Sequence, residues 1–234
     1  KYNYSRPSNT GIKSFKDYDL REISKYIDWT FFFHSWKISG RYPTIFDDPV
    51  KGKEAKQLYG DAIVLLERII EEKMLTANAV VGVFPCNSIG DRVEVYNDSG
   101  EVITEFNFLR NQQLKDKGHP NLSLTDFIAP ASSGKRDHIG MFAVTSGIGS
   151  NEQIKKFEIE SDDYQTIMFK ILTDRLAEAF AELMHAKVRR SYWGYSADEN
   201  INIPDMIKER YQGIRPAPGY PACPEHSEKR VLFD

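Results

Sequence analysis

The stretch "DYQTIMFKILTDRLAEAFAELMHAKVRR" (residues 163–190) is the longest periodic segment of the chain. At 100° per residue its large apolar side chains fall on one side, which predicts a long helix packed against a core. That stripe comprises Met168, Leu172, Leu176, Ala179, Phe180 and Leu183. Capping candidates precede the helix and a basic run closes it, as the helix dipole favours: Ser161, Asp162 and Asp163, then Lys187, Arg189 and Arg190.

The opposite side of this helix carries Glu178, with Asp174 and His185 close to it in angle. Two interpretations stay open at this point. One is a solvated face, which periodicity alone favours because charged side chains are mostly exposed. The other is a wall of carboxylates that faces a ligand.

Outward from the helix, the sequence period changes to that of strands. "AVVGVFP" (residues 79–85) reads as a buried strand, and "RVEVY" and "EVITEFNF" alternate around the turn residues 97–100, which indicates a hairpin. "GMFAVTSG" (residues 140–147) predicts another strand, and residues 53–74 predict an amphipathic helix. Strands joined by a hairpin and bracketed by long helices predict an α+β domain with a mainly antiparallel sheet.

The composition excludes several classes of function. The chain has 234 residues and a formal net charge of −3, with no basic excess of the kind that nucleic-acid surfaces show. Its apolar runs are too short to span a bilayer, so no membrane partner is expected. Two cysteines, Cys86 and Cys223, are too few for a disulfide framework and favour a reducing cytoplasm.

The two ends of the chain predict a piece of a longer protein. Residues 1–19 are mostly polar and read as a linker or N-terminal arm. The chain closes on "SEKRVLFD" (residues 227–234), which predicts a helix capped by Ser227 and cut off before its apolar side can pack. We therefore expect one domain over residues 20–234 that is incomplete at its C-terminus.

The segment "RPAPGYP" (residues 215–221) is rigid and irregular, because proline fixes φ and donates no backbone hydrogen bond. Arg215 can pair a carboxylate bidentately, Gly219 permits close backbone approach and Tyr220 offers a ring for stacking. These features favour a small-molecule loop. The segment also fits RxxPxxP, the pattern of an SH3-type ligand, so an interaction segment is the alternative.

Other kinds of site find less support. Cys223 and His226 have the spacing of two metal ligands, but no second pair accompanies them, so no metal site is predicted. Neither a phosphate-binding glycine loop nor a GxSxG nucleophile motif is present. No catalytic residue is predicted.

At this point a family resemblance becomes visible. "YQGIRPAPGYPACPEHSEK" resembles the S-adenosylmethionine (AdoMet) signature of the activation domain of cobalamin-dependent methionine synthase. "YIDWTFFFHSW", "VVGVFPCNSIGD", "SLTDFIAP" and "GMFAVT" resemble the same domain in the same order, as does the long helix. The resemblance covers nearly the whole chain from about residue 20, and it implies a C-shaped α+β domain with a twisted antiparallel sheet flanked by long helices.

The resemblance also implies a function. Such a domain binds AdoMet, closes over the cobalamin-binding module of the same polypeptide and supports reductive methylation of cob(II)alamin, with flavodoxin or a related reductase as electron donor. AdoMet is then the cofactor bound here, and cobalamin is held by another module. Nothing in the chain resembles that module, so this chain alone is not expected to make methionine. The alternative within the same architecture is a docking-only module without AdoMet binding.

Six site residues follow from the resemblance. Arg215 is expected to hold the AdoMet carboxylate, Glu178 to approach its amino-acid end and Asp28 to lie near the adenine. Ala217 is expected to contribute backbone contacts, and Gly219 and Tyr220 complete the signature. An acidic wall suits this ligand, because AdoMet carries a sulfonium and an ammonium charge. The resemblance thus favours the ligand wall over the solvated face for Glu178.

Overall fold

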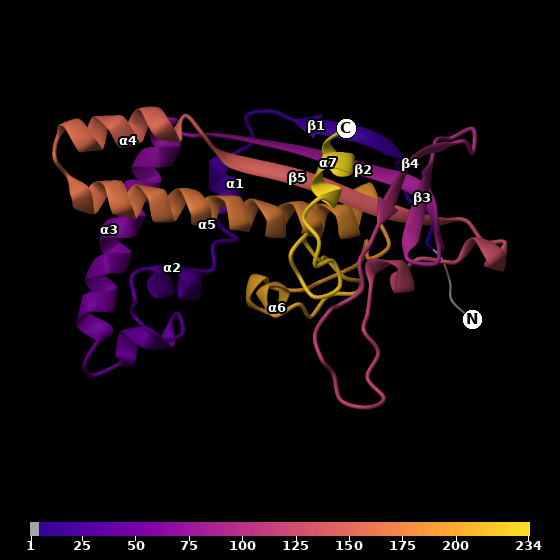
Figure 1. Cartoon of the computed structure of the whole chain (residues 1–234). Coiled ribbons are helices and arrows are strands. Elements are labelled where there is room, and N and C mark those ends of the chain that lie inside the picture. The colour runs from indigo at the N-terminus through magenta and orange to yellow at the C-terminus, as the bar shows by residue number, and fades with distance from the viewer. Residues whose placement is uncertain (1–4) are drawn as a thin grey trace.

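The computed structural model describes residues 5–234, and within them one antiparallel sheet of five strands forms the body of the molecule (Figure 1). The strand order is β1-β2-β3-β4, and β5 pairs with the other edge of β2. The bounds are β1 Gly11–Phe15, β2 Thr76–Ile89, β3 Arg92–Tyr96, β4 Val102–Asn107 and β5 Asp137–Ile148. The predicted α+β class with a mainly antiparallel sheet is confirmed.

The long strand β2 organises the sheet. Its residues 79–83 pair with β1, in the register Gly11 opposite Val83, and its last four residues pair with β3. β5 follows the opposite edge, with Gly140 opposite Val83. The predicted hairpin joins β3 to β4, where Asn97 and Glu101 close the turn through a backbone hydrogen bond of 2.9 Å.

The helices carry most of the main core. Their bounds are α1 Leu20–Ser24, α2 Trp29–Ser35, α3 Gly52–Glu71, α4 Ser150–Ile159, α5 Asp163–Lys187, α6 Ile203–Ile207 and α7 Glu228–Phe233. Short 3-10 turns lie at Thr44–Asp47, Leu124–Phe127 and Ala131–Ser133. None of the described helices is both long enough and apolar enough to cross a membrane.

α5 confirms the predicted helix and its apolar side. All six residues of the stripe are at most 2% exposed, and they pack with α3 and the sheet into one cluster. Asp162 is the N-cap, and its side chain accepts from the Gln165 N–H at 2.9 Å. The predicted helix runs on to residue 190, and there the structure has a π-helical turn, Val188–Tyr192, instead.

The predicted linker or N-terminal arm, residues 1–19, contains a strand in the structure, and its residues 1–4 lie outside the described part of the chain. Gly11–Phe15 form β1, an edge strand in register with β2, and the Phe15 ring lies 5.4 Å from that of Tyr192. The Ser8 N–H also donates to the Trp193 carbonyl oxygen at 2.9 Å. The polar pattern hid this strand because four of its five residues are exposed, as is common on a sheet edge.

The C-terminal helix corrects a second expectation. α7 begins after Ser227, but the Ser227 side chain makes no capping hydrogen bond. The apolar side of α7 is packed in part, because Val231 and Leu232 contact a second, smaller cluster that contains Phe106, Phe108 and Cys223, whereas Phe233 is 72% exposed. A carboxylate oxygen of Glu228 in α7 also accepts from the Asn107 N–H of β4 at 3.0 Å.

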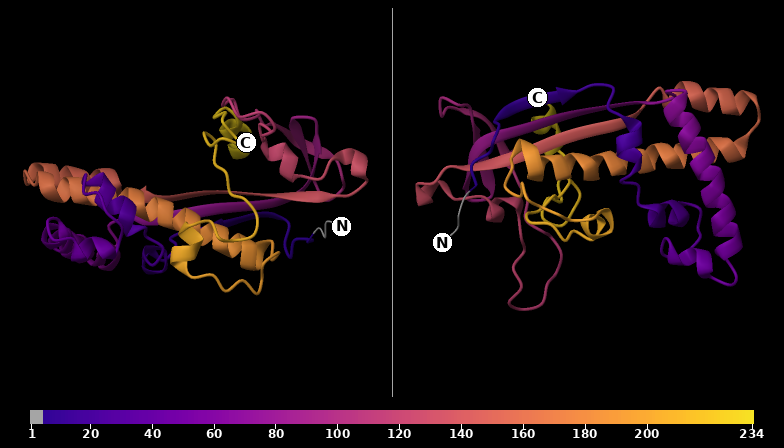
Figure 2. Two further views of the ribbon diagram at one scale, coloured as in Figure 1. Left: turned by 90° about the horizontal axis from the view of Figure 1, so that it is seen from below. Right: turned by 180° about the vertical axis from the view of Figure 1, so that it is seen from behind.

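The arrangement of these parts produces the predicted C shape. α5 lies along one face of the long strands, and α2 and α3 project from one end of it while α6 lies below the other (Figure 1). The view from below shows α7 and the β3–β4 hairpin on the side of the sheet opposite α6 (Figure 2). The chain between α6 and α7 therefore crosses from one side to the other, and the proline-rich segment is part of that crossing.

Candidate functional site

The face of α5 that points away from the core passes from exposed to buried along its length. Asp174 and Glu178 are exposed, as a solvated face predicts. One turn further on, the Glu182 side chain is only 19% exposed, and His185 is 4% exposed. His185 therefore does not belong to a solvated face, which corrects the first interpretation of this side of the helix.

His185 is buried because residues beyond α5 fold back over the end of the helix. The Tyr211 ring packs edge-on against the imidazole with the centroids 4.7 Å apart, and the Arg189 Nη1 donates to the imidazole Nδ1 at 2.8 Å. Arginine only donates, so Nδ1 carries no proton. Burial, with the charges of Arg189 and Arg215, lowers the pKa of His185 to about 3, which keeps it neutral.

Arg189 holds this cluster together. Its side chain is fully buried, and its Nε and Nη2 donate to the two carboxylate oxygens of Glu199 at 2.8 and 2.6 Å. The Tyr211 ring covers the guanidinium at 4.3 Å. A buried charge is tolerated when it is paired in this bidentate way, and the same hydrogen bonds hold the pKa of the Glu199 carboxyl below its ordinary value.

Arg215 reaches α5 from the proline-rich segment. Its Nη2 donates to the Glu182 Oε1 across 33 residues of sequence. Burial raises the pKa of the Glu182 carboxyl above its ordinary value, against the lowering effect of the Arg215 and Arg189 charges. The negative charge of Glu178 raises that pKa as well, which places Glu178, Glu182 and Arg215 in one electrostatic neighbourhood.

Two polar atoms of this ion pair lack hydrogen-bond partners. The Glu182 Oε2 and the Arg215 Nε are both buried, and no described residue bonds to either. Buried polar groups are nearly always hydrogen-bonded in native proteins. The ion pair therefore keeps hydrogen-bonding capacity that the described side chains do not use.

The signature residues that follow Arg215 form a tight turn. The Gly219 N–H donates to the Cys223 carbonyl oxygen at 2.8 Å, and the Tyr220 N–H to that of Ala217 at 3.0 Å. Gly219 has a φ of +104°, and a Cβ there would lie 2.8 Å from the His226 ring. Ala217 and Tyr220 are exposed, Tyr220 by 62%, so both are accessible to a ligand.

Asp28 occupies a different part of the molecule. It is the N-cap of α2, and its side chain accepts from the Thr30 N–H at 2.9 Å. No described contact joins it to Arg215 or Glu178. α2 does lie against α5, where the Arg175 guanidinium sits 5.9 Å from the Phe31 ring centroid. The helix that Asp28 caps and the Arg215 segment thus both contact α5.

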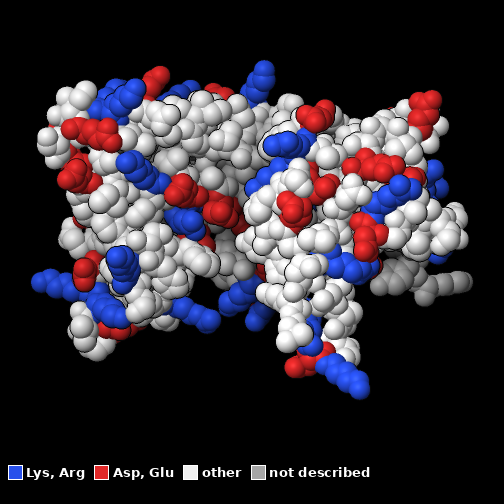
Figure 3. Space-filling model, viewed as in Figure 1, with Lys and Arg blue, Asp and Glu red and all other residues white. Residues whose placement is uncertain are grey.

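The surface over this part of α5 is hollowed. The space-filling view shows a hollow between α2 and α6, with acidic and basic side chains on its floor where α5 runs (Figure 3). Carboxylates and an arginine at the same place suit a zwitterion, since each of its charges finds a partner of opposite sign. The hollow is therefore our candidate ligand site.

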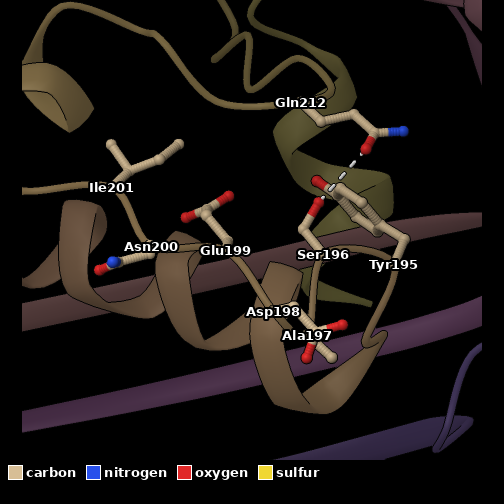
Figure 4. A pocket seen from close by; sticks show the side chains of 8 residues that line it. All are labelled: Tyr195, Ser196, Ala197, Asp198, Glu199, Asn200, Ile201 and Gln212. Atoms are coloured by element: carbon tan, nitrogen blue, oxygen red, sulfur yellow. Dashed lines mark hydrogen bonds between the residues drawn. The ribbon is translucent and has the colours of Figure 1, made fainter.

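A separate pocket of about 430 Å³ lies beside this site (Figure 4). It is lined by Tyr195, Ser196, Ala197, Asp198, Glu199, Asn200, Ile201 and Gln212, none of which is a predicted site residue. Glu199 is its link to the site, through the pair with Arg189. No three His, Cys, Asp or Glu residues among residues 5–234 are grouped as a metal site would require.

The sequence interpretation missed four residues of this neighbourhood, namely Glu182, Arg189, Glu199 and Tyr211. Glu182 carried a signal, because it follows Glu178 by four positions in "AEAFAE" and so lies on the same helical face. Tyr211 also carried a signal, because it is the first residue of the quoted "YQGIRPAPGYPACPEHSEK". Arg189 and Glu199 carried none, since their contacts depend on how the chain folds back after the π-helical turn.

Two comparisons with known proteins match nearly the whole chain. The family model described as "Vitamin B12 dependent methionine synthase, activation domain" matches residues 19–234. The chain is also similar to a solved structure described as "Crystal Structure of the MetH Reactivation Domain bound to AdoHcy", with 46% sequence identity and a TM-score of 0.94. The match covers 99% of this chain and 71% of that chain.

Proposed function

The chain belongs to the family of activation domains of vitamin B12-dependent methionine synthase, and on that premise we propose that it binds AdoMet in the hollow on α5 and serves cobalamin reactivation. The observation that carries the site is the Arg215–Glu182 pair beside Glu178, with its two unpartnered buried atoms. The similar solved structure holds AdoHcy, which shares the amino-acid and adenosine parts of AdoMet.

The residues present fit this ligand. Arg215 holds the carboxylate of the amino-acid end of AdoMet. Glu178 lies on the outward face of α5, and its negative charge stabilises the ammonium group. Asp28 stands on the adenine side of the hollow, while the backbone of Ala217 and the turn at Gly219 and Tyr220 border the ligand. When bound, AdoMet supplies an electrophilic methyl group, and the protein's part is positioning and exclusion of water.

The wider role follows from membership in the family. We place the cobalamin-binding module of the full protein opposite the hollow, flavodoxin or a related reductase as the electron donor, and the whole system in the cytoplasm. The full protein is a methyltransferase, and this chain is its reactivation part. In this scheme residues 20–234 form the domain, and the arm of residues 1–19 adds β1 to its sheet.

The alternatives have less support. A proline-motif interaction segment needs residues 215–221 to be free, whereas Arg215 pairs with α5 and the Gly219 N–H is bonded to Cys223. The Leu124 N–H also donates to the Ala222 carbonyl oxygen at 3.0 Å, just beyond the motif. A docking-only module does not account for the two unpartnered buried atoms, the Glu182 Oε2 and the Arg215 Nε.

Calorimetric titration of AdoMet into the chain tests the proposal. Arg215→Ala should weaken binding by more than tenfold, because a charge-assisted bidentate contact is worth about 1.5–3 kcal/mol. The matched control is Arg210→Ala, which removes an exposed arginine of the same segment that pairs with Asp205 at 2.9 Å. It should leave the affinity unchanged.

Two outcomes would count against the proposal, and they differ. If the folded parent chain binds no AdoMet, the docking-only alternative replaces AdoMet binding. If the parent binds and Arg215→Ala binds equally well, the ligand lies elsewhere and Arg215 leaves the site. Thermal melts of each variant show whether a loss of binding reflects a loss of fold.

A further inference from the structure

We propose that Glu182 is a positioning residue, which holds the Arg215 guanidinium where a ligand carboxylate can reach it. The inference rests on the proposed function and adds a residue to that site. Glu182 is outside the six residues that the family resemblance points to. The proline-rich segment is attached to the rest of the molecule through side chains, and Glu182 receives one of them.

The backbone around Arg215 has little support of its own. In the described part of the chain, no backbone hydrogen bond involves residues 211–216. The neighbouring anchors lie outside this stretch, at the Arg210 N–H, which donates to Asp205, and at the turn that begins with Ala217. A segment without backbone hydrogen bonds is held in place by its side chains.

Two side chains of the stretch reach α5 and the turn after it. Tyr211 packs on His185 and covers Arg189, so it fixes the start of the stretch. Arg215 fixes its end through Glu182. Without Glu182, the long arginine side chain would lose its charged partner on the helix and keep only the neighbouring Tyr211 hydroxyl, so it would be held less firmly.

Glu182 is better suited to this task than Glu178. It is one turn closer to the covered end of α5, and its side chain is mostly buried, as is that of Arg215 with 24% exposed. A pair screened from water is more rigid and more strongly coupled than a surface pair. Glu178, which is exposed, stays available to the ligand.

The arrangement divides the work among three charges. Glu182 orients Arg215, Arg215 binds the carboxylate and Glu178 faces the ammonium. Sites in which the binding group is locked by a neighbouring hydrogen bond bind better, because less freedom is lost on binding. Glu182 therefore acts on the ligand through Arg215, and its effect on affinity should vanish once Arg215 is removed.

A double-mutant cycle with AdoHcy as the titrated ligand tests this dependence. Four proteins are compared by calorimetry: the parent, Glu182→Ala, Arg215→Ala and the double variant. Glu182→Ala should weaken AdoHcy binding by about fivefold or more, as the loss of a locking hydrogen bond implies. The double variant should bind within about twofold of Arg215→Ala alone, since independent effects would multiply instead.

The conservative variant separates positioning from a general structural effect. Glu182→Gln keeps an oxygen that can accept from Arg215, so it should bind AdoHcy more tightly than Glu182→Ala. Glu72→Ala is the matched control, because it breaks another glutamate–arginine pair, with Arg68 at 3.1 Å, at the end of α3. It should bind like the parent, and melting temperatures of all variants report the fold.

The outcomes distinguish this inference from the proposed function. A parent chain that binds neither AdoHcy nor AdoMet refutes the proposed function itself. A parent that binds, with Glu182→Ala binding equally well or more tightly, refutes the inference alone, and tighter binding would mean that Glu182 competes with the ligand for Arg215. Multiplicative losses in the double variant would also overturn it, because they give Glu182 a role that does not pass through Arg215.

Discussion

Gly219 shows how a single residue can be required by the turn it occupies. Its φ of +104° lies in the region that side chains with a Cβ rarely adopt, and the His226 ring covers the position where a Cβ would stand. The proline-rich sequence already suggested close backbone approach at this glycine. The structure adds that the close neighbour within the chain is a histidine seven residues further on.

Gly219→Ala should therefore destabilise the turn and weaken AdoMet binding. The positive φ and the displaced ring together should cost about 1–2 kcal/mol of the free energy of unfolding. For a chain of this size, that lowers the melting temperature by about 2–8 °C, measured by calorimetry.

The control for this prediction is Gly60→Ala. Gly60 is an exposed helical residue of α3, and a Cβ there meets nothing within 4 Å. Alanine favours a helix over glycine by up to about 1 kcal/mol, so this variant should melt higher than the parent. Equal melting temperatures for the parent and Gly219→Ala would show that the turn adapts without strain.

At the scale of the element, α5 combines two roles along its length. One side packs the core throughout, while the other side is solvated near Glu178 and buried near His185. The change occurs where the chain after the π-helical turn returns over the helix with Glu199 and Tyr211. The exposed part of α5 is thus accessible to a ligand, and its buried end holds the segment with Tyr211 and Arg215 in place.

Burial of His185 predicts a specific dependence of stability on pH. Its pKa is lowered to about 3 in the folded chain, against an ordinary value of 6.5. On acidification the His185 imidazole is therefore protonated in the unfolded chain before it is protonated in the folded chain. The contribution of neutral, buried His185 to the free energy of unfolding is complete above pH 6.5 and is lost as the pH falls toward 3. His185 should account for about 1–2 kcal/mol of the stability lost between pH 7 and pH 5.

Urea unfolding of the parent and His185→Gln at both pH values measures this contribution. The variant should lose less stability on acidification than the parent, because glutamine can accept from Arg189 but does not titrate. His34→Gln serves as the control, since His34 is exposed on α2, and it should follow the parent. Parallel pH dependence in the parent and His185→Gln would mean that the buried imidazole is not the titrating group.

For the whole molecule, the decisive contacts join segments that are far apart in sequence. β1 closes one edge of the sheet, where Phe15 contacts the aromatic rings of Tyr18 and Tyr192 at 6.1 and 5.4 Å. Tyr192 is the last residue of the π-helical turn, after which the chain folds back over α5. The N-terminal arm therefore supports the part of the molecule from which the candidate site is built.

Phe15→Ala should lower the free energy of unfolding by about 1–3 kcal/mol, less than a fully buried phenylalanine would, because this ring is half-buried. Ile12→Ala, on the same strand, is the control, since Ile12 is 71% exposed and should matter by no more than about 0.5 kcal/mol. Urea unfolding at pH 7 compares the two variants. Equal stability of both would show that β1 contributes little to the fold.

Several elements could be predicted from local patterns of residues. The apolar stripe of α5, the helix of α3 and the hairpin between β3 and β4 follow from periods of 3.6 and 2 and from turn residues, and all three are present. The resemblance to the activation domains also predicted the family and its AdoMet role, and the comparisons confirm both. The positions of the six site residues stay predictions for a liganded structure.

Local patterns did not predict the burial of His185, the pairing of Arg215 with Glu182 or the strand in the N-terminal arm, which became visible only in the folded chain. Each depends on contacts between residues that local periodicity does not connect: β1 meets β2 more than sixty residues later, and Arg215 meets α5 across 33 residues. Local patterns report which side of an element is apolar. Which polar side chain becomes buried depends on where segments distant in sequence fold back over the element.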